Sequence, residues 1–363
     1  MAEAPALKEI FDAQRFRTFA REIAAIHPRF GSKRFLALAL RDLAALSLTQ
    51  RMRRMTESLH ATLPADYLKA LAVLRRLAPR IERGFSTLVL PDFVGLYGVD
   101  QFDASLDALK FFTTFGSSEF GIRPFLRSDL ARTLAVMETW SRDPDEQVRR
   151  LASEGCRPRL PWSFRIDALV ADPTPVVPIL ENLRADPSLY VRKSVANHLN
   201  DITKDHPDWV LDRLESWPLK DPHTRWIAKR ALRTLIKKGD RRALAVIGAG
   251  AKPLVNVRDL ELKPRVLSLG ERLTVSLQVE SNSTKAQRLV VDYVIHYVKK
   301  SGGTSGKVFK LKEFTLPART SVTLSRAQIV RDFTTRVHHA GRHEVEIIVN
   351  GERLARGCFE LRR

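Results

Sequence analysis

The sequence predicts a multidomain protein, an all-α HEAT-like repeat solenoid over residues 1–250 followed by an all-β immunoglobulin-like sandwich over residues 255–363. Three observations support this prediction. The chain has 363 residues, more than one hydrophobic core usually serves. Apolar residues recur at helical spacing up to about residue 247 and alternate in strand-like runs beyond it. Three similar segments also recur in the helical part, as in stacked repeats.

The helical part contains amphipathic stretches such as RFLALALRDLAALSL and YLKALAVLRRLAP. Its repeats are DPDEQVRRLASEG from Asp143, DPSLYVRKSVANHL from Asp186 and DPHTRWIAKRALRTL from Asp221. Their starts lie roughly 35 to 45 residues apart, the scale of HEAT-type repeats. In each Asp-Pro pair, the Asp can cap a helix whose first position tolerates Pro. We expect helix pairs stacked into a curved solenoid with a concave face.

The strand-rich part follows a linker marked by Gly248, Gly250 and Pro253. Runs such as LTVSLQV and LVVDYVIHYV alternate, and Asn350-Gly351 predicts a tight hairpin turn. Short strands and frequent turns predict an immunoglobulin-like sandwich. One face of the second run is expected to be buried, namely Leu289, Val291, Tyr293, Ile295 and Tyr297.

The strongest compositional signal is charge, because the chain carries a net +20 and has a pI near 10.4. About half of the excess lies after residue 250, so both predicted parts are basic. Such a field attracts polyanions, and nucleic acid is the first partner to consider. A soluble protein that is merely basic is the alternative.

The second helix of each repeat carries a basic pair at nearly the same offset. The pairs are Arg149-Arg150, Arg192-Lys193 and Lys229-Arg230. Stacked in register, they would form a cationic stripe. One such pair is often only a solvated face, but three pairs together with the net charge favour contact with phosphates.

The remaining features exclude several classes of protein. No apolar run approaches eighteen residues and the first residues lack the pattern of a signal peptide, so we expect a cytoplasmic protein without a membrane segment. Cys156 and Cys358 fall in different predicted domains, and neither has a Cys or His at zinc spacing. We expect both to be free thiols.

Two further motifs are set aside. SGGTSGK at 301–307 has Ser where a phosphate loop begins with Gly and Val after its Lys, so it predicts a hairpin loop. His338, His339 and His343 lie close together, but without the acidic or Cys ligands of a metal site. A basic turn that touches phosphate is the alternative for these histidines. We expect no metal and no cofactor.

Two acidic residues lie where structure alone does not demand them. Glu119 precedes the helix that Pro124 is expected to begin, which leaves Glu119 and Phe120 exposed in the preceding turn. Glu154 falls in the last turn of a repeat helix, where the helix dipole disfavours an anion by about half a kcal/mol. An ion pair with Arg150, four residues earlier, is the alternative role for Glu154.

A Trp and a third acid complete the set. Trp162 lies in a loop stiffened by Pro158 and Pro161, and either it packs as a cap on the core or it has a function. Asp201 is expected near a helix end, on the face of Ser194 and away from the apolar stripe. Its alternative is a solvated surface acid. Three carboxylates and an indole suit hydrolysis of an N-glycosidic bond, which builds positive charge on the sugar.

At these residues the chain resembles the AlkC branch of the bacterial HEAT-like alkylpurine DNA glycosylases. The resemblance runs through SSEFGIRPFL, EGCRPRLPW, YVRKSVANHLNDI and DPHTRWIAKRALR in the repeats, and through VVDYVIHYVKKSG, KVFKL and TTRVHHAGRHEVEIIVNG in the sandwich. It implies release of 3-methyladenine, with 3-methylcytosine as a second substrate, in the first step of base excision repair. It also implies that duplex DNA is held between solenoid and sandwich and sharply bent, exposing the lesion without full base flipping.

The resemblance also implies roles for individual residues. Glu119, Glu154 and Asp201 would be the active-site acids and Trp162 would lie against the damaged nucleotide. Asp201 is the first choice for activating water, by analogy with the single catalytic Asp of the related AlkD branch. Besides the three basic pairs, DNA contacts are expected at Phe120, Arg157 and Arg159.

The expected partner is duplex DNA that contains alkylated bases, bound by a monomer. Two alternatives are a non-catalytic HEAT-repeat scaffold for acidic proteins and a protein that binds damaged DNA without cutting it. Release of a base from methylated duplex distinguishes the enzyme from both.

Overall fold

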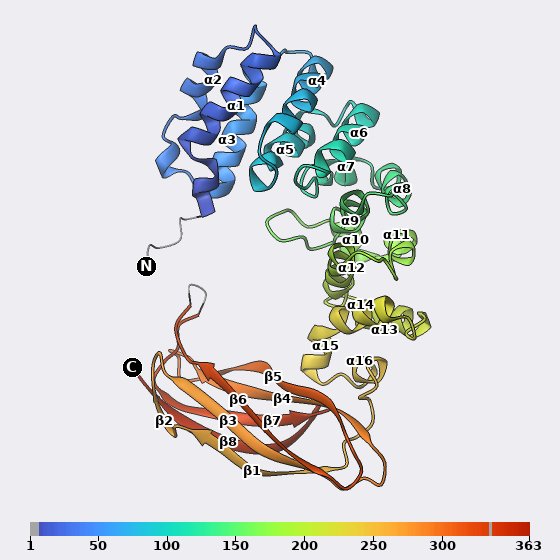
Figure 1. The fold of residues 1–363 in the computed structure, drawn as a ribbon, viewed down its shortest axis with the longest axis vertical. Helices are drawn as coiled ribbons and strands as arrows, with labels where there is room; N and C mark the ends of the chain where they lie inside the picture. Colours follow the sequence, from blue (N-terminus) through green and yellow to red (C-terminus); the bar gives the residue numbers. More distant parts are fainter. Residues whose placement is uncertain (1–6, 334–335) are drawn as a thin grey trace. The chain divides into compact units, whose positions relative to one another are not determined.

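The computed structural model describes residues 7–333 and 336–363, and confirms the predicted fold class (Figure 1). Helices occupy the chain up to Val246 and strands follow from Val255. Thr334 and Thr335, which belong to the motif TTRVHHAGRHEVEIIVNG, lie outside the described residues. Within the described part of the chain, no helix has the length and apolar character needed to cross a membrane.

The chain forms two compact units, whose boundary does not coincide with the change from helices to strands. One unit comprises the chain up to Pro207 with Lys220–Ile227, and the other comprises Asp208–Leu219 with Ala228–Arg363. The last helices therefore belong with the sandwich. This division places the predicted site residues up to Asp201 in the first unit, and Lys229 and Arg230 in the second.

In the first unit, successive helices stack in chain order (Figure 1). Their apolar faces supply its core, in which Phe11, Phe16, Phe93 and Phe125 are among the fully buried side chains. The helices are α1 (Ala13–Ile26), α2 (Ser32–Ala39), α3 (Leu48–His60), α4 (Tyr67–Leu77), α5 (Val89–Tyr97), α6 (Phe102–Thr113), α7 (Arg123–Ser128), α8 (Leu130–Trp140), α9 (Glu146–Glu154), α10 (Asp167–Ala171), α11 (Val177–Asn182) and α12 (Leu189–Ile202).

The three predicted repeats correspond to α9, α12 and α14 (Pro222–Ala231). The predicted capping is correct only for α14, where Asp221 accepts a hydrogen bond from a backbone N–H in the first turn. It is wrong for the other two, whose caps are Asp145 and Ser188. There, Asp143 and Asp186 instead accept the N–H two residues further on, because a short carboxylate can close a local turn before a helix begins.

Helices α9 and α12 pack side by side and form the part of the first unit that carries most of the candidate residues (Figure 1). The predicted apolar stripe of α12 is confirmed, since Val191, Val195, Leu199 and Ile202 are all buried. This packing fixes the opposite, polar face of α12 beside the C-terminal end of α9.

The second unit combines a sandwich with the last helices, α13 (Pro207–Ser216), the end of α14, α15 (Arg233–Lys238) and α16 (Arg241–Val246). One sheet has the order β1-β3-β6 and the other β2-β8-β7-β4-β5. The strands are β1 (Val255–Lys263), β2 (Val266–Ser268), β3 (Arg272–Ser281), β4 (Gln287–Val298), β5 (Thr304–Leu316), β6 (Ser321–Ile329), β7 (Gly341–Val349) and β8 (Glu352–Arg362).

The sequence signals of the sandwich are confirmed. All five residues of the predicted buried face of β4 lie in the core between the sheets. Asn350 and Gly351 join β7 to β8 with positive φ angles of 47° and 83°, as a two-residue hairpin turn requires. The residues of SGGTSGK form the turn between β4 and β5 and the start of β5.

The interpretation of the histidines as a basic turn is wrong for two of them. His338 and His343 are buried, and burial lowers the pKa of both imidazoles. A buried neutral imidazole cannot serve as an exposed cation for phosphate. Both Cys156 and Cys358 are free thiols, as predicted.

Asp292 on β4 gives a prediction about stability. Burial raises the pKa of this carboxyl to about 6, although Lys310 and Lys237 act in the opposite direction. The folded protein therefore binds this proton more tightly than the unfolded chain, and stability falls as pH rises from about 4 to 6. Asp292→Asn should raise the free energy of unfolding at pH 7.5 by up to about 3 kcal/mol.

Urea unfolding at pH 7.5 and pH 4 checks this prediction. At pH 4 the gain from Asp292→Asn should largely disappear, because the native carboxyl is then protonated. Exposed Asp259 in β1 offers a control, since its replacement by Asn should leave the pH dependence unchanged. An equal effect of Asp292→Asn at both pH values would contradict the prediction.

Candidate active site

A pocket with a volume of about 390 Å³ lies in the first unit. It is bounded by the end of α9, the loop that follows α9, the turn before α7 and the segment before α5. Its lining combines acids, an arginine and aromatic rings. The lining residues are Gly84, Phe85, Leu88, Gly116, Ser117, Glu119, Phe120, Glu154, Arg157, Leu160, Pro161 and Trp162.

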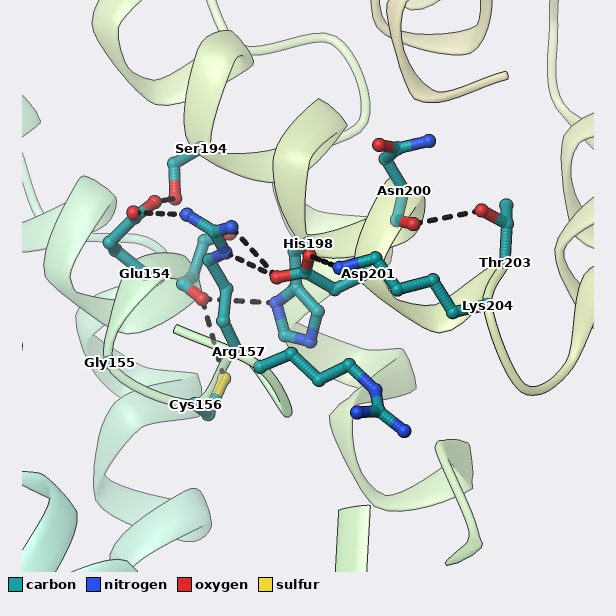
Figure 2. Close-up of polar contacts among 12 residues, drawn as sticks. Glu154, Gly155, Cys156, Arg157, Ser194, His198, Asn200, Asp201, Thr203 and Lys204 are labelled. Atoms are coloured by element: carbon teal, nitrogen blue, oxygen red, sulfur yellow. Dashed lines mark hydrogen bonds and ion pairs between the residues drawn. The ribbon is translucent and has the colours of Figure 1, made fainter. Parts of the chain in front are cut away.

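Glu154 is the best-connected acid of this pocket. It is the last residue of α9, and its side chain is 8% exposed. Arg157 Nη1 lies 2.6 Å from Glu154 Oε1, and the Ser194 hydroxyl donates to Glu154 Oε2 at 2.6 Å (Figure 2). The predicted ion pair with Arg150 is also present at 3.4 Å. Glu154 therefore both pairs with Arg150 and lines the pocket, so the two interpretations of this residue do not exclude each other.

Asp201 lies on the other side of the same arginine. Its Oδ2 accepts hydrogen bonds from Arg157 Nε at 2.8 Å, and its Oδ1 accepts one from Lys204 at 3.1 Å (Figure 2). Because its side chain is only 7% exposed, the alternative of a solvated surface acid is wrong. Asp201 is not among the residues that line the pocket. The guanidinium of Arg157, which does line the pocket, lies between the pocket and the Asp201 carboxylate.

Glu119 extends the chain of charges in the opposite direction. Arg150 Nη1 donates to Glu119 Oε2 at 3.0 Å and to the Ser117 hydroxyl at 2.6 Å. Burial acts to lower the pKa of Arg150, but Glu119 and Glu154 outweigh it and raise this pKa. The expected exposure of Glu119 is wrong, since its side chain is 13% exposed. The result is an alternating row, Glu119, Arg150, Glu154, Arg157, Asp201 and Lys204.

Trp162 occupies the loop that joins α9 to α10, residues 155–166 (Figure 1). The residue is 69% exposed, so the alternative of a core-capping Trp is wrong. Its φ of 64° is a left-handed conformation that non-glycine residues rarely adopt. The ring meets Phe85 edge-on at a centroid distance of 6.3 Å. An exposed indole thus stands at the pocket beside a second aromatic ring.

His198 and Cys156 are a potential base and a potential nucleophile near the acids of the site, but both stay uncharged at neutral pH. His198 is fully buried, and burial lowers the pKa of its imidazole to about 3. Its Nδ1 lies 3.0 Å from the carbonyl oxygen of Ser153. Burial also raises the pKa of the Cys156 thiol to about 12. At neutral pH neither group exchanges a proton readily, which leaves the carboxylates as the candidates for acid and base chemistry.

The basic pairs of the repeats do not form the uniform stripe that the sequence suggests. Arg149 makes two hydrogen bonds to the carboxylate of Asp186, at 2.7 and 3.2 Å, and two to backbone carbonyls. Arg192 donates to the carbonyls of Asp186 and Pro187. These two arginines therefore hold the Asp-Pro turns in place. Their guanidinium groups are engaged within the protein, which corrects the expectation of a free cationic row.

Apart from Arg150, whose side chain is 14% exposed, the other members of the pairs are more accessible. Lys193 and Arg230 are exposed, and exposed Lys229 pairs with Glu313 of β5 at 2.8 Å, within the second unit. Arg159, from the loop after α9, makes a two-pronged ion pair with Asp205 at 2.8 and 2.9 Å. These side chains keep solvent-facing surface that a phosphate could reach.

Comparisons with known proteins match both the helical and the strand-rich part of the chain. Residues 103–235 match the family described as "DNA alkylation repair enzyme", and residues 256–363 match the C-terminal Ig-like domain of the protein YhaZ. The uncharacterized protein YhaZ of Bacillus subtilis (strain 168) is 43% identical over 95% of this chain and 96% of its own length.

The solved structure of the Pseudomonas fluorescens alkylpurine DNA glycosylase AlkC, bound to DNA containing an abasic site analog, is 56% identical. It superimposes with a TM-score of 0.96 and covers 99% of this chain and 100% of its own. This chain belongs to the AlkC family. Membership places it among the alkylpurine DNA glycosylases of alkylation repair, and confirms the resemblance recognised in its motifs.

Proposed function

We propose that this AlkC-family protein hydrolyses the N-glycosidic bond of 3-methyladenine and 3-methylcytosine in duplex DNA and so starts base excision repair. The observation that supports this best is the coincidence of Glu119, Glu154 and Trp162 at one pocket. Its volume of about 390 Å³ lies in the range typical of small-ligand sites. The AlkC structure bound to DNA containing an abasic site analog supports DNA as the partner.

The chemistry follows from the charge of the lesion. When the bond between C1′ and the base nitrogen breaks, its electron pair neutralises the cationic base, which leaves without prior protonation. The sugar then carries the positive charge, and the carboxylates of Glu119 and Glu154 stabilise it. The indole of Trp162 offers an electron-rich face to the cationic base. Water adds to C1′ and loses a proton, for which Asp201 is the proposed acceptor.

Solvent-accessible cations are proposed to bind the DNA backbone. Arg159 lies in the loop after α9 and keeps 29% of its side chain exposed, and Phe120, which lines the pocket, would contact the nucleotide there. Lys193, Lys229 and Arg230 would contact phosphates further away. We do not extend this proposal to Arg149 and Arg192, whose guanidinium groups bind the Asp-Pro turns, or to Arg150 and Arg157, whose guanidinium groups bind the acids of the site.

The direct test is release of free base from duplex oligonucleotides that each carry one defined lesion. We expect release of 3-methyladenine and 3-methylcytosine, and an intact strand until the abasic site is cleaved by alkali. Binding to the damaged duplex without release would contradict the proposed function and favour a protein that only recognises damage. Absence of binding to any duplex would favour a scaffold.

Glu119→Gln and Glu154→Gln should each slow release by roughly tenfold to fiftyfold, because each removes one charge that stabilises the sugar cation. Single-turnover rates at saturating enzyme measure this loss. Half-buried Glu138 on α8 pairs with Arg142, and Glu138→Gln provides a control that should keep the wild-type rate. A lower melting temperature with an unchanged rate would show that the glutamates are structural.

A further inference from the structure

Arg123, the first residue of α7, is a fully buried arginine beneath the pocket loop. Burial lowers the pKa of its guanidinium to about 10, so the group still carries its charge at neutral pH. Replacing a buried ionic group by an apolar one of similar volume is often neutral or stabilising. Packing alone therefore does not explain why an arginine occupies this position.

The acceptors of Arg123 are backbone carbonyls of one loop. Its Nη1 donates to the carbonyl oxygens of Gly155 at 3.0 Å and Arg157 at 2.8 Å. Its Nη2 donates to the carbonyl oxygen of Phe164, and the Phe164 ring centroid lies 5.2 Å from its guanidinium carbon. One side chain from α7 thus binds both ends of the 155–166 loop.

The loop between these anchor points carries functional side chains. Arg157, whose carbonyl accepts from Arg123, uses its own guanidinium to join Glu154 and Asp201. Trp162 stands in a left-handed conformation that persists only when its surroundings enforce it. Because Trp162 is mostly exposed and its ring meets Phe85 only edge-on, its side chain contributes little to that enforcement, and the anchored backbone on either side is the stronger source.

We propose that Arg123 is a positioning residue of the excision site, which holds the 155–166 loop at both ends and thereby places Trp162 and Arg157 at the pocket. This inference rests on the proposed function, because the site it serves is the proposed excision site. Lysine cannot substitute for it. Three carbonyls in different directions match the fork of a guanidinium, whereas an ammonium is a single point of charge.

The test compares Arg123→Met and Arg123→Lys in the full chain with a matched control. Arg51 on α3 is also buried, at 3% exposure, and its guanidinium also donates to backbone carbonyls, those of Leu43 and Leu46. It does not line the pocket. Arg51→Met therefore reproduces the loss of a buried carbonyl-binding arginine whose hydrogen bonds go to residues outside the 155–166 loop.

Both Arg123 variants should release base roughly tenfold to fiftyfold more slowly in single turnover, because a displaced loop misplaces groups around the reacting bond. Their dissociation constants for duplex DNA should stay within about threefold of wild type, since phosphate contacts are spread over several cations. Arg51→Met should keep the wild-type rate even if its melting temperature falls equally. If Arg123→Met does not fold, Arg123→Lys carries the test, because it retains the buried charge.

Limited trypsin digestion supplies a readout that does not depend on activity. Arg159 and Arg165 lie within the loop, and both should be cut faster in the Arg123 variants than in Arg51→Met. Wild-type rates of release with unchanged cleavage would overturn the inference, as would an equal kinetic loss in Arg51→Met. If the wild-type protein itself released no base, the proposed function would be wrong, and the cleavage pattern alone would decide whether Arg123 holds the loop.

Discussion

Replacing Asp201 with asparagine is expected to slow base release at least about a hundredfold, the usual contribution of a general base. Asparagine keeps the shape of the side chain, and its carbonyl oxygen can still accept a hydrogen bond from Arg157. The variant loses the negative charge that would take the proton from water. Affinity for DNA should stay constant or rise, because one anion near the phosphates is gone. Single-turnover release and equilibrium binding measure the two quantities separately.

Asp205 provides the matched control for this experiment. It pairs with Arg159, which comes from the same loop as Arg157, and its side chain is 27% exposed. Asp205→Asn therefore weakens an equivalent link between the loop and the end of α12 without touching the row of charges at the pocket. Its rate should stay close to wild type. Equal losses in both variants would show that anchoring of the loop, not proton transfer, explains the effect of Asp201→Asn.

The position of Asp201 behind Arg157 makes the comparison with Glu154 informative. Glu154 lines the pocket, whereas Asp201 reaches it only past the guanidinium that binds both acids. If Asp201 activates water, Asp201→Asn should be the slower variant. A larger loss in Glu154→Gln would transfer the role of base to Glu154 and leave Asp201 as the residue that orients Arg157.

Much of the fold could be predicted from the sequence, because its signals are local. The apolar stripe of α12 and the Asn350-Gly351 turn depend on neighbours a few residues away. The Asp-Pro caps failed for a different reason. The same carboxylate can cap a helix or close a two-residue turn, and only tertiary contacts, such as that of Asp186 with Arg149, decide between them.

The sequence indicates several residues that the structure brings to one candidate site, but not the contacts that connect them. Glu154 and Asp201 stood out as acids near helix ends, yet the sequence does not show that Arg157 joins them, because the two lie in different helices. Arg123 and Ser194 were not singled out as site residues. An arginine at the start of a helix and a serine within one are common, and only the fold shows what they touch. Burial and charge pairing depend on how helices pack in three dimensions, and the spacing of residues along the sequence does not reveal them.

The sandwich is expected to contribute a large part of DNA binding, although it lies far along the chain from the acids. Residues 299–312 contain five lysines and no acidic residue. Within this segment, burial lowers the pKa of Lys307, and the positive charges of Arg336 and Lys237 lower it further. Such a concentration of cations on the hairpin of β4 and β5 is suited to phosphate.

A chain that ends at residue 250 tests the sandwich as a whole. The helices of the first unit should remain folded, because repeats are stabilised mainly by their neighbours. Contacts of the last helices are lost, including the ion pair of Arg241 with Glu352 and the close approach of Gly239 to Gly351. We expect circular dichroism to stay largely helical while base release falls at least about a hundredfold. Full activity of a folded truncation would show that the sandwich serves another purpose.

Neutralising the hairpin in the full chain separates lost charge from lost folding. Lys299, Lys300, Lys307 and Lys312 are exposed, and their joint replacement by Gln should weaken binding to damaged and undamaged duplex alike. Each phosphate contact contributes about 0.9 to the slope of log affinity against log salt, so the loss of four lysines should flatten the slope by up to about 3.6 units. The control replaces exposed cations of β1, of the turn that follows β1 and of β3 by Gln, namely Arg258, Lys263, Arg265 and Arg272. An equal loss of DNA affinity in the control would mean that the net charge of the protein determines binding. The hairpin of β4 and β5 would then make no specific contribution.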